Sequence, residues 1–217
     1  MNMLIKQAND ILSGKNFEYA FCGGLAIDLF LGYNSRRHSD IDISVYWKDR
    51  STIILYMQSL GFKIYEMLGE GKAHQVTDVN NQFYKKRNIF CCTDDCELVS
   101  FIKTNEEGIV LIDFKHIGQT KLNFIEFLFN DKTDKDFLYA RNHKIKQALN
   151  SAVLCKNGIP YLSPEMCLLY KSTDTERAGY QSDYDAAISK MSKVQKEWFY
   201  QALQIMFPEG HKWGLRV

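Results

Sequence analysis

The segment that most constrains the fold runs over residues 40–46, where acidic or polar residues alternate with aliphatic ones. A period of two is the pattern of a β-strand whose aliphatic face is buried. Asp40 and Asp42 then project together from the opposite face, about 6.5–7 Å apart along the chain. Two neighbouring carboxylates repel each other, and bound cations relieve that repulsion. The segment therefore predicts a strand with a metal-binding carboxylate pair, and a merely solvated strand face is the alternative.

A pair of glycines lies upstream of this strand. A short strand-like run over 17–22 meets Gly23 and Gly24, and a helical pattern over 25–31 ends at Gly32. Without Cβ atoms, a Gly-Gly turn lets the backbone approach a triphosphate and direct N–H groups and a helix N-terminus toward it. Gly-Gly alone more often forms a simple turn. Its position ahead of the acidic pair favours phosphate binding.

The remaining patterns separate a mixed α/β part from a helical part. Helical spacing is expected over 3–13 and 49–60, and strand-like runs over 62–67, 88–92, 98–104, 109–114 and 122–129. The charged stretch 130–136 reads as a surface loop. Ser163 and Pro164 start a helix over 164–171, and helical spacing returns over 183–191 and 194–207. We predict an α/β (α+β) fold with one domain over residues 1–150 and a helical region over 151–217.

Charge and cysteine content limit the classes of protein to which this chain can belong. Lys and Arg total 27 against 26 for Asp and Glu, whereas nucleic-acid-binding domains usually carry a basic excess. The sequence contains neither a membrane span nor an export signal, so its six cysteines predict reduced thiols in a cytoplasmic protein. Cys91, Cys92 and Cys96 cluster, but a zinc site needs a second half-site. Buried strand thiols are therefore expected there.

Two blocks of sequence resemble the nucleotidyltransferase superfamily that includes DNA polymerase beta, and are most similar to the bacterial aminoglycoside and lincosamide nucleotidyltransferases. The first block supplies the family's Gly-Gly turn, helix-ending Gly and Arg-x-His-x-Asp-x-Asp segment through Gly23, Gly24, Gly32, Arg36, His38, Asp40 and Asp42. The second block is the Gly-Ile-Pro-Tyr-Leu-x-Pro-Glu segment over 158–165, followed by a Leu-Leu-x-Lys helix that ends in Lys171.

This resemblance implies a polymerase beta-like mixed sheet with flanking helices, followed by a helical C-terminal region that contributes to the acceptor pocket. It also implies transfer of a nucleotide from an NTP, with ATP expected, to a hydroxyl of a small-molecule acceptor such as an aminoglycoside- or lincosamide-type antibiotic. Two Mg²⁺ ions would serve as cofactors, and neither a membrane nor a nucleic acid is expected as a partner. Two alternatives stay open: a nucleotidyltransferase of the toxin–antitoxin type that modifies a protein or RNA, and a catalytically silent nucleotide-binding module.

The family carries a third carboxylate on a later strand. Glu126 shares a strand face with apolar residues, where an unpaired carboxylate is costly to bury, and Asp113 competes on the same argument. The order of the family segments, with Arg141 following, favours Glu126 as the third metal ligand and as the group that takes the acceptor proton. Most relatives have Asp at this position, so Glu126 reaches one methylene further.

Two cations are candidate phosphate ligands by resemblance, namely Arg36 and Lys171. A solvated helix face is the alternative for Lys171. Asp28, on the helix after Gly-Gly, is expected to be exposed rather than catalytic, and His38 is expected to order the turn before the acidic pair rather than bind metal.

The chain departs from its relatives after the second block. Relatives often have Arg-Pro-Lys-Asp, two further residues and then Asp-Phe. Here Arg177 and Asp183 fit that pattern, but Gly179 and Tyr180 replace its Lys and Asp. If that Lys holds phosphate in relatives, another cation must serve in this chain.

Overall fold

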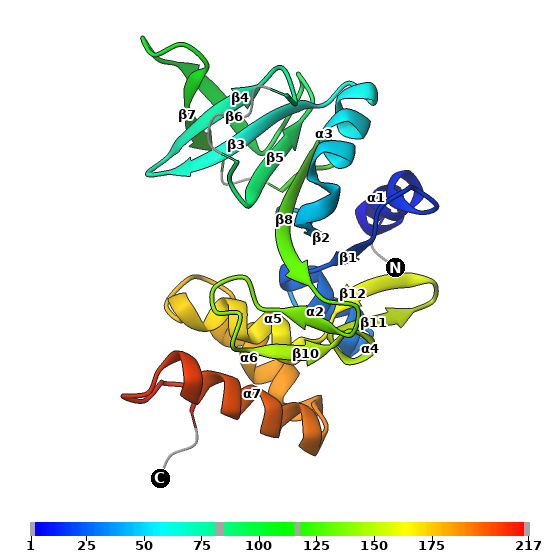
Figure 1. The fold of residues 1–217 in the computed structure, drawn as a ribbon, viewed down its shortest axis with the longest axis vertical. Coiled ribbons are helices and arrows are strands. Elements are labelled where there is room, and N and C mark those ends of the chain that lie inside the picture. The colour runs from blue at the N-terminus through cyan, green and yellow to red at the C-terminus, as the bar shows by residue number, and fades with distance from the viewer. Residues whose placement is uncertain (1–2, 81–84, 116–117, 215–217) are drawn as a thin grey trace. The chain divides into compact units, whose positions relative to one another are not determined.

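The computed structural model describes residues 3–80, 85–115 and 118–214, and the chain divides into two compact units. The first unit holds the chain up to Tyr19 together with His38–Asn130. The second unit holds Ala20–Arg37 together with the chain from Asp131 onward. Each unit is therefore built from separate stretches of sequence, as the colours of Figure 1 show.

The first unit contains a mixed sheet and two α-helices. Its helices are α1 (Met3–Leu12) and α3 (Arg50–Ser59), with a 3₁₀ turn, η1 (Trp47–Asp49), ahead of α3. Its strands are β2 (Asp42–Tyr46), β3 (Lys63–Gly69), β4 (Lys72–Val76), β5 (Asn88–Cys92), β6 (Val99–Lys103), β7 (Ile109–Phe114) and most of β8 (Phe124–Lys132). The strand order is β2-β8-β5-β3-β4-β7-β6, in which only β2 and β8 are parallel.

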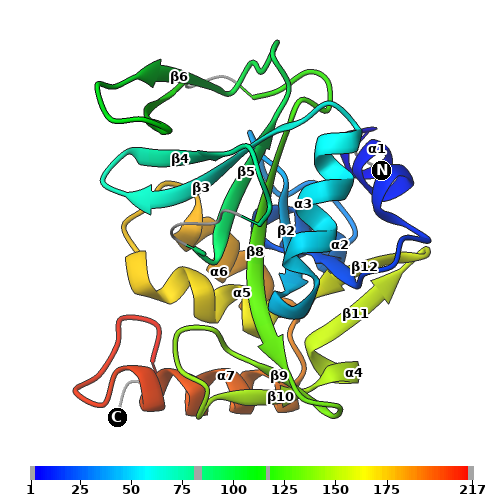
Figure 2. The same cartoon turned by 45° about the horizontal axis from the view of Figure 1, so that its top comes forward.

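The register of β8 decides which face of this sheet is available for chemistry. Ile125, Phe127 and Phe129 alternate along the strand and are at most 1% exposed. Phe129 meets the ring of Trp47 edge-on at 5.9 Å, just ahead of α3, and α3 packs against β3 (Figures 1 and 2). Because side chains alternate across a strand, Glu126 points to the other face.

The second unit is mostly helical. Its helices are α2 (Gly23–Leu31), α4 (Leu149–Ala152), α5 (Pro164–Lys171), α6 (Tyr180–Lys190) and α7 (Lys193–Met206), with a 3₁₀ turn, η2 (Ser172–Asp174). Its strands are the end of β1 (Tyr19–Phe21), β9 (Asp136–Leu138), β10 (Lys146–Ala148), β11 (Val153–Lys156) and β12 (Ile159–Leu162). Helix α2 packs on α5 and α6, and α5 also packs on α7 (Figure 2). Among the described residues, no helix combines the length and the apolar character needed to cross a membrane.

Most predicted elements form, two expectations fail, and one strand was not predicted. The stretch 130–136 is not simply a loop, because β8 continues to Lys132 and pairs with β9. Lys132 lies opposite the buried Phe137 in this pair, and it remains partly exposed to solvent. Strand β4 was not predicted, since its five residues carry little periodicity. The region after residue 150 is not wholly helical, because β11 and β12 form an antiparallel hairpin ahead of α5.

The predicted division at residue 150 differs from the boundaries of the compact units. Helix α2 is local in sequence to the acidic pair, yet it belongs to the second unit because its apolar side chains pack on α5 and α6. Packing between segments more than a hundred residues apart leaves no local signature. The assignment of residues 1–150 to a nucleotidyltransferase domain stays a functional prediction.

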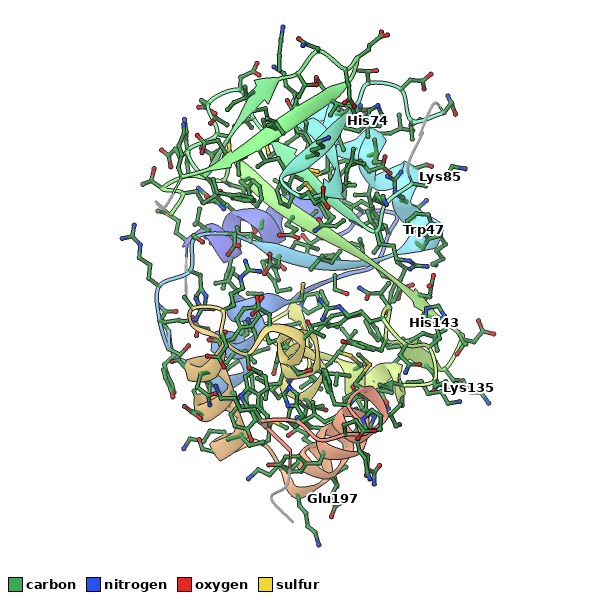
Figure 3. All side chains as sticks on the ribbon, turned by 90° about the vertical axis from the view of Figure 1, so that its left-hand side faces the viewer. Trp47, His74, Lys85, Lys135, His143 and Glu197 are labelled. Atoms are coloured by element: carbon green, nitrogen blue, oxygen red, sulfur yellow. The ribbon has the colours of Figure 1, made fainter. Side chains whose placement is uncertain are left out.

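A buried ion pair links α3 to the sheet of the first unit. The Arg50 Nη2 lies 2.5 Å from Glu66 Oε1, and both side chains are at most 4% exposed. The backbone N–H of Lys86 also donates to that carboxylate. Two of the neighbouring rings are labelled in Figure 3: Trp47, which lies under the Arg50 guanidinium, and His74, whose Nδ1 is 3.8 Å from Glu66 Oε2.

Arg50→Met should lower the free energy of unfolding by about 3 kcal/mol or more, because it leaves the Glu66 carboxylate buried without its counter-ion. Urea unfolding measures the loss. In the matched control, Lys63→Met removes a cation that pairs with Asp94 at the surface, and it should change stability little. Equal effects of the two substitutions would show that the buried pair is unimportant.

Candidate functional site

Three carboxylates meet at the start of β2. Asp42 is the first residue of β2, and its register partner on the parallel strand β8 is Glu126. Asp40 lies just ahead of the strand rather than on it, which differs from the predicted strand over 40–46. One carboxylate oxygen from each residue lies within 4.8 Å of the others, and all three residues are partly exposed.

The structure brings Glu126, and not Asp113, to the acidic pair. Asp113 lies exposed on β7, where it accepts a hydrogen bond of 3.3 Å from the Ser100 hydroxyl. Glu126 is fixed beside the pair because its backbone N–H donates to the Ile41 carbonyl at 2.9 Å. The role of Glu126 as metal ligand and base remains a prediction.

The three carboxylates suit a hard divalent cation. Their donors are all oxygen, the ligand that Mg²⁺ prefers, and their mutual repulsion is relieved when a cation binds between them. Within the described residues, no other group of acidic, His or Cys side chains is spaced to hold a metal. The thiols at 91 and 92 are buried on β5, as expected of strand cysteines.

A side chain that the sequence did not single out touches this cluster. The Asn88 Nδ2 donates to Glu126 Oε1 at 2.7 Å. Asn88 begins β5 and lies opposite Leu128, two residues beyond Glu126 on β8. The strand that contains Asn88 was predicted with the correct bounds. The contact of Asn88 with Glu126 depends on the pairing of β5 with β8, which the sequence does not show.

The Gly-Gly turn that is predicted to bind phosphate lies in the second unit, at the N-terminus of α2. Gly23 opens the helix with a φ of 64°, a backbone conformation that favours glycine. Cys22 occupies the N-cap without a side-chain bond to the backbone, so the first turn keeps N–H groups for a ligand. Gly24 is buried in that turn. This geometry is compatible with phosphate binding, which stays a prediction.

The expectation that Asp28 is exposed was wrong. Asp28 is 5% exposed, and its Oδ1 accepts hydrogen bonds from the Ser35 N–H at 2.8 Å and the Ser35 hydroxyl at 2.5 Å. The carboxylate therefore fixes the loop that follows α2. A polar residue on a helix can face inward when a later loop supplies donors, and the helical pattern alone does not show this.

Arg36 and Lys171 converge on one buried carboxylate. Asp183, on α6, is fully buried and receives two bonds from Arg36, at 2.8 and 2.9 Å, and one contact from Lys171 Nζ at 3.0 Å. Burial acts to raise the pKa of Asp183, but the Arg36 hydrogen bonds and the Lys171 charge outweigh it and hold that pKa below its usual value. The solvated-face interpretation of Lys171 is wrong, because its side chain is only 6% exposed.

The departure at Gly179 and Tyr180 has a structural explanation. Gly179 has a φ of 84°, and a Cβ there would lie 2.9 Å from Arg36 Nε. A Lys at that position would collide with the guanidinium as it binds Asp183. The Tyr180 ring instead lies 4.1 Å from Lys171 Nζ, an attractive cation–π contact. Arg36 and Lys171 each carry one positive charge and Asp183 carries one negative charge, so the group has a net charge of +1.

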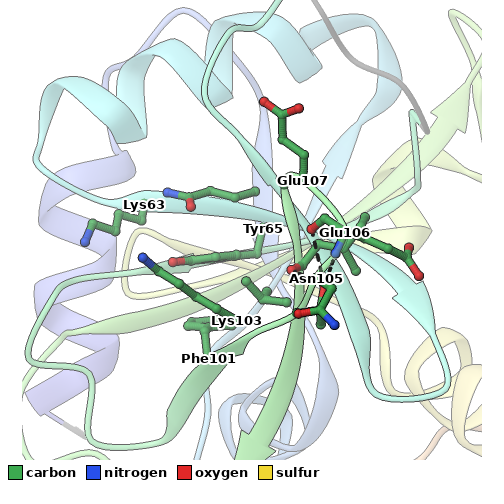
Figure 4. A pocket seen from close by; sticks show the side chains of 12 residues that line it. Lys63, Tyr65, Phe101, Lys103, Asn105, Glu106 and Glu107 are labelled. Atoms are coloured by element: carbon green, nitrogen blue, oxygen red, sulfur yellow. Dashed lines mark hydrogen bonds between the residues drawn. The ribbon is translucent and has the colours of Figure 1, made fainter.

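A separate hollow in the first unit contains none of the predicted site residues. Its volume is about 410 Å³, and its lining includes the Tyr65 ring, which stacks on Phe101 at 3.7 Å (Figure 4). Lys103, Glu106 and Glu107 also line it. Charges of both signs surround the opening, so the hollow does not select a ligand of one charge.

Gly179→Ala should lower the free energy of unfolding by more than the roughly 1 kcal/mol expected from a strained φ alone, because the new methyl group also displaces Arg36 from Asp183. Gly158→Ala is the matched control: its φ is 78°, but a Cβ there meets nothing within 4 Å. Chemical unfolding of both variants isolates the collision. Equal losses would show that Arg36 moves aside without cost.

Known proteins resemble this chain in sequence and in fold. A family model described as aminoglycoside-2''-adenylyltransferase matches residues 4–79, which include the Gly-Gly turn and the acidic pair. A comparison with curated proteins gives no match.

Solved structures extend the likeness over most of the chain. The lincosamide antibiotic adenylyltransferase LnuA, bound to lincomycin, matches with a TM-score of 0.54 at 15% identity, covering 88% of this chain and 98% of that one. The solution structure of the antibiotic-resistance factor ANT(2'')-Ia matches with a TM-score of 0.53 at 13% identity, covering 95% of this chain and 92% of that one. The complex of ANT(2'')-Ia with adenylyl-2''-tobramycin matches with a TM-score of 0.51 at 12% identity, covering 94% of this chain and 99% of that one. The chain thus has the fold of the antibiotic nucleotidyltransferases and resembles the aminoglycoside-2''-adenylyltransferase family in its N-terminal part, which supports an enzyme of the nucleotidyltransferase class.

Proposed function

We propose that this protein is a Mg²⁺-dependent nucleotidyltransferase that transfers a nucleotide from an NTP, with ATP expected, to a hydroxyl of a small molecule. The observation that carries the proposal is the meeting of Asp40, Asp42 and Glu126 within 4.8 Å. In the balanced reaction, the acceptor oxygen bonds to the α-phosphorus, the bond to the bridging oxygen breaks, and pyrophosphate and the acceptor proton leave.

The three carboxylates would hold two Mg²⁺ ions, which supply charge neutralisation to the attacking oxygen, the leaving oxygen and the phosphates when bound. Glu126 is the proposed base for the acceptor proton. Glu126 lies opposite Asp42 across the β2–β8 pair, so the proposed base and one proposed metal ligand share a sheet face. An in-line displacement at phosphorus needs a base and metal ligands that lie close together.

The phosphates of the NTP would be bound by the N-terminal turn of α2, which begins with Gly23 and Gly24. Arg36 and Lys171 add positive charge within the same unit, although both already bind Asp183. Arg36 is the more available of the two, since its side chain is 28% exposed against 6% for Lys171. We propose Arg36 as the nearer phosphate ligand and Lys171 as a buried charge that supports it.

The similar proteins support an antibiotic as the acceptor. One of the solved structures contains lincomycin, and another contains adenylyl-2''-tobramycin, an antibiotic that carries the transferred nucleotide. We propose an acceptor of this kind, which would make the protein an antibiotic-resistance enzyme.

A transfer assay tests the function. Purified protein is incubated with each of four α-labelled NTPs, Mg²⁺ and a panel of aminoglycosides and lincosamides, and the products are identified by mass spectrometry. A nucleotidylated antibiotic supports the proposal. Label found only on protein or RNA would favour the toxin–antitoxin type of enzyme. NTP binding that is independent of Mg²⁺ and yields no product would favour the silent module.

Asp42→Asn should abolish transfer while leaving the fold intact, because one of the three ligands loses its charge. Without Mg²⁺, the melting temperature should be unchanged or higher, since the substitution removes part of a like-charge repulsion. Asp113→Asn is the matched control, because that carboxylate lies outside the cluster, and its transfer rate should stay near that of the wild type. Near wild-type transfer by Asp42→Asn would overturn the mechanism.

A further inference from the structure

Resting on the function proposed above, we infer that Asn88 is a positioning residue that holds the Glu126 carboxylate in its metal-binding orientation. The contact that carries this inference is the 2.7 Å hydrogen bond from Asn88 Nδ2 to Glu126 Oε1. Asn88 acts through Glu126 and is not itself a proposed metal ligand or base.

The strand register explains how Asn88 reaches this carboxylate. Glu126 on β8 lies between Asp42 on β2 and Phe90 on β5. Asn88 is two residues from Phe90, so it is the diagonal neighbour of Glu126 on the same sheet face. The side chain therefore approaches Glu126 from the strand opposite to the one that carries Asp42. The carboxylate is positioned from one side and faces the acidic pair on the other.

The length of the Glu126 side chain makes such a restraint useful. Glu has one more rotatable bond than Asp, so it loses more conformational freedom when it is fixed at a metal. A hydrogen bond that selects one orientation before metal binding reduces that loss. The hydrogen bond from Asn88 reduces the loss for Glu126 in this way.

The chemical type of the donor also fits. An amide is neutral, so it orients the carboxylate without neutralising the charge that attracts a cation. A cation is available next to it in sequence, yet the Arg87 guanidinium lies 5.0 Å from the Trp47 ring and its Nη1 faces the Phe129 carbonyl at 3.4 Å. The residue that meets Glu126 is the uncharged one.

The other end of the Asn88 amide indicates a functional rather than a stabilising role. Its Oδ1 is buried and has no hydrogen-bond partner within the described residues. A buried acceptor without a partner costs stability. A leucine of similar size would remove that cost, so a residue selected for folding alone would not need to be Asn.

The test compares Asn88→Leu with the wild type by thermal unfolding over a series of Mg²⁺ concentrations, using Mg²⁺ alone as the probe. Without Mg²⁺, the variant should melt at the same or a higher temperature. The Mg²⁺ concentration that gives half of the thermal stabilisation should rise about tenfold or more, the usual effect of removing a group that orients a metal ligand. Transfer at saturating NTP should fall in parallel.

Two further variants make the result specific. In a Glu126→Gln background, Asn88→Leu should change the Mg²⁺ response less than about twofold, because a residue that acts through Glu126 has nothing left to orient. Asn123→Leu is the matched control, since Asn123 also has a buried Oδ1 without a partner in the described chain but donates to the Asp95 carbonyl. Its Mg²⁺ response should equal that of the wild type.

The possible failures are distinguishable. A wild-type Mg²⁺ response that Glu126→Gln removes but Asn88→Leu retains would overturn the role of Asn88 and leave the proposed function standing. A lower melting temperature with an unchanged Mg²⁺ response would assign Asn88 a structural role only. No Mg²⁺ response in the wild type would overturn the metal site, and this inference with it.

Discussion

The repulsion among three carboxylates is the interaction on which the rest of the structure depends. Each would be more stable apart and in water, and the parallel pairing of β2 with β8 keeps Asp42 and Glu126 opposite each other regardless. The buried residues on the other face of β8 supply the energy that maintains this register. The pairing thus keeps carboxylate oxygens of the three residues within 4.8 Å of one another, and in the proposed function a divalent cation relieves their repulsion.

The acidic pair and its strand could be predicted because they depend on local spacing, whereas the two blocks came from resemblance to a family. The sequence could also favour Glu126 over Asp113, although only family order separated them, since both lie on strands with similar neighbours. The inward position of Asp28 and the contact of Asn88 with Glu126 could not be predicted. Each depends on a loop or strand that pairs across the fold, and such pairing has no periodic signature.

The same limit applies to the cations. Arg36 and Lys171 were candidates because they match family positions, but both bind Asp183, which lies on another helix and is 147 residues from Arg36. A sequence pattern identifies a charged residue without showing which charges it meets. In the second unit the outcome is a compact arrangement in which one buried carboxylate sets the orientation of two cations and reduces their mutual repulsion.

The close approach of Arg36 to Gly179 has a consequence for how such a chain can diverge. The space that a side chain at 179 would fill is already occupied by the guanidinium. A lineage that gained Lys at 179 while Arg36 remained on Asp183 would pass through a strained intermediate, and one that lost Arg36 first would leave Asp183 with Lys171 as the remaining cation of the trio. The two positions therefore constrain each other, because the effect of a side chain at 179 depends on whether Arg36 is present.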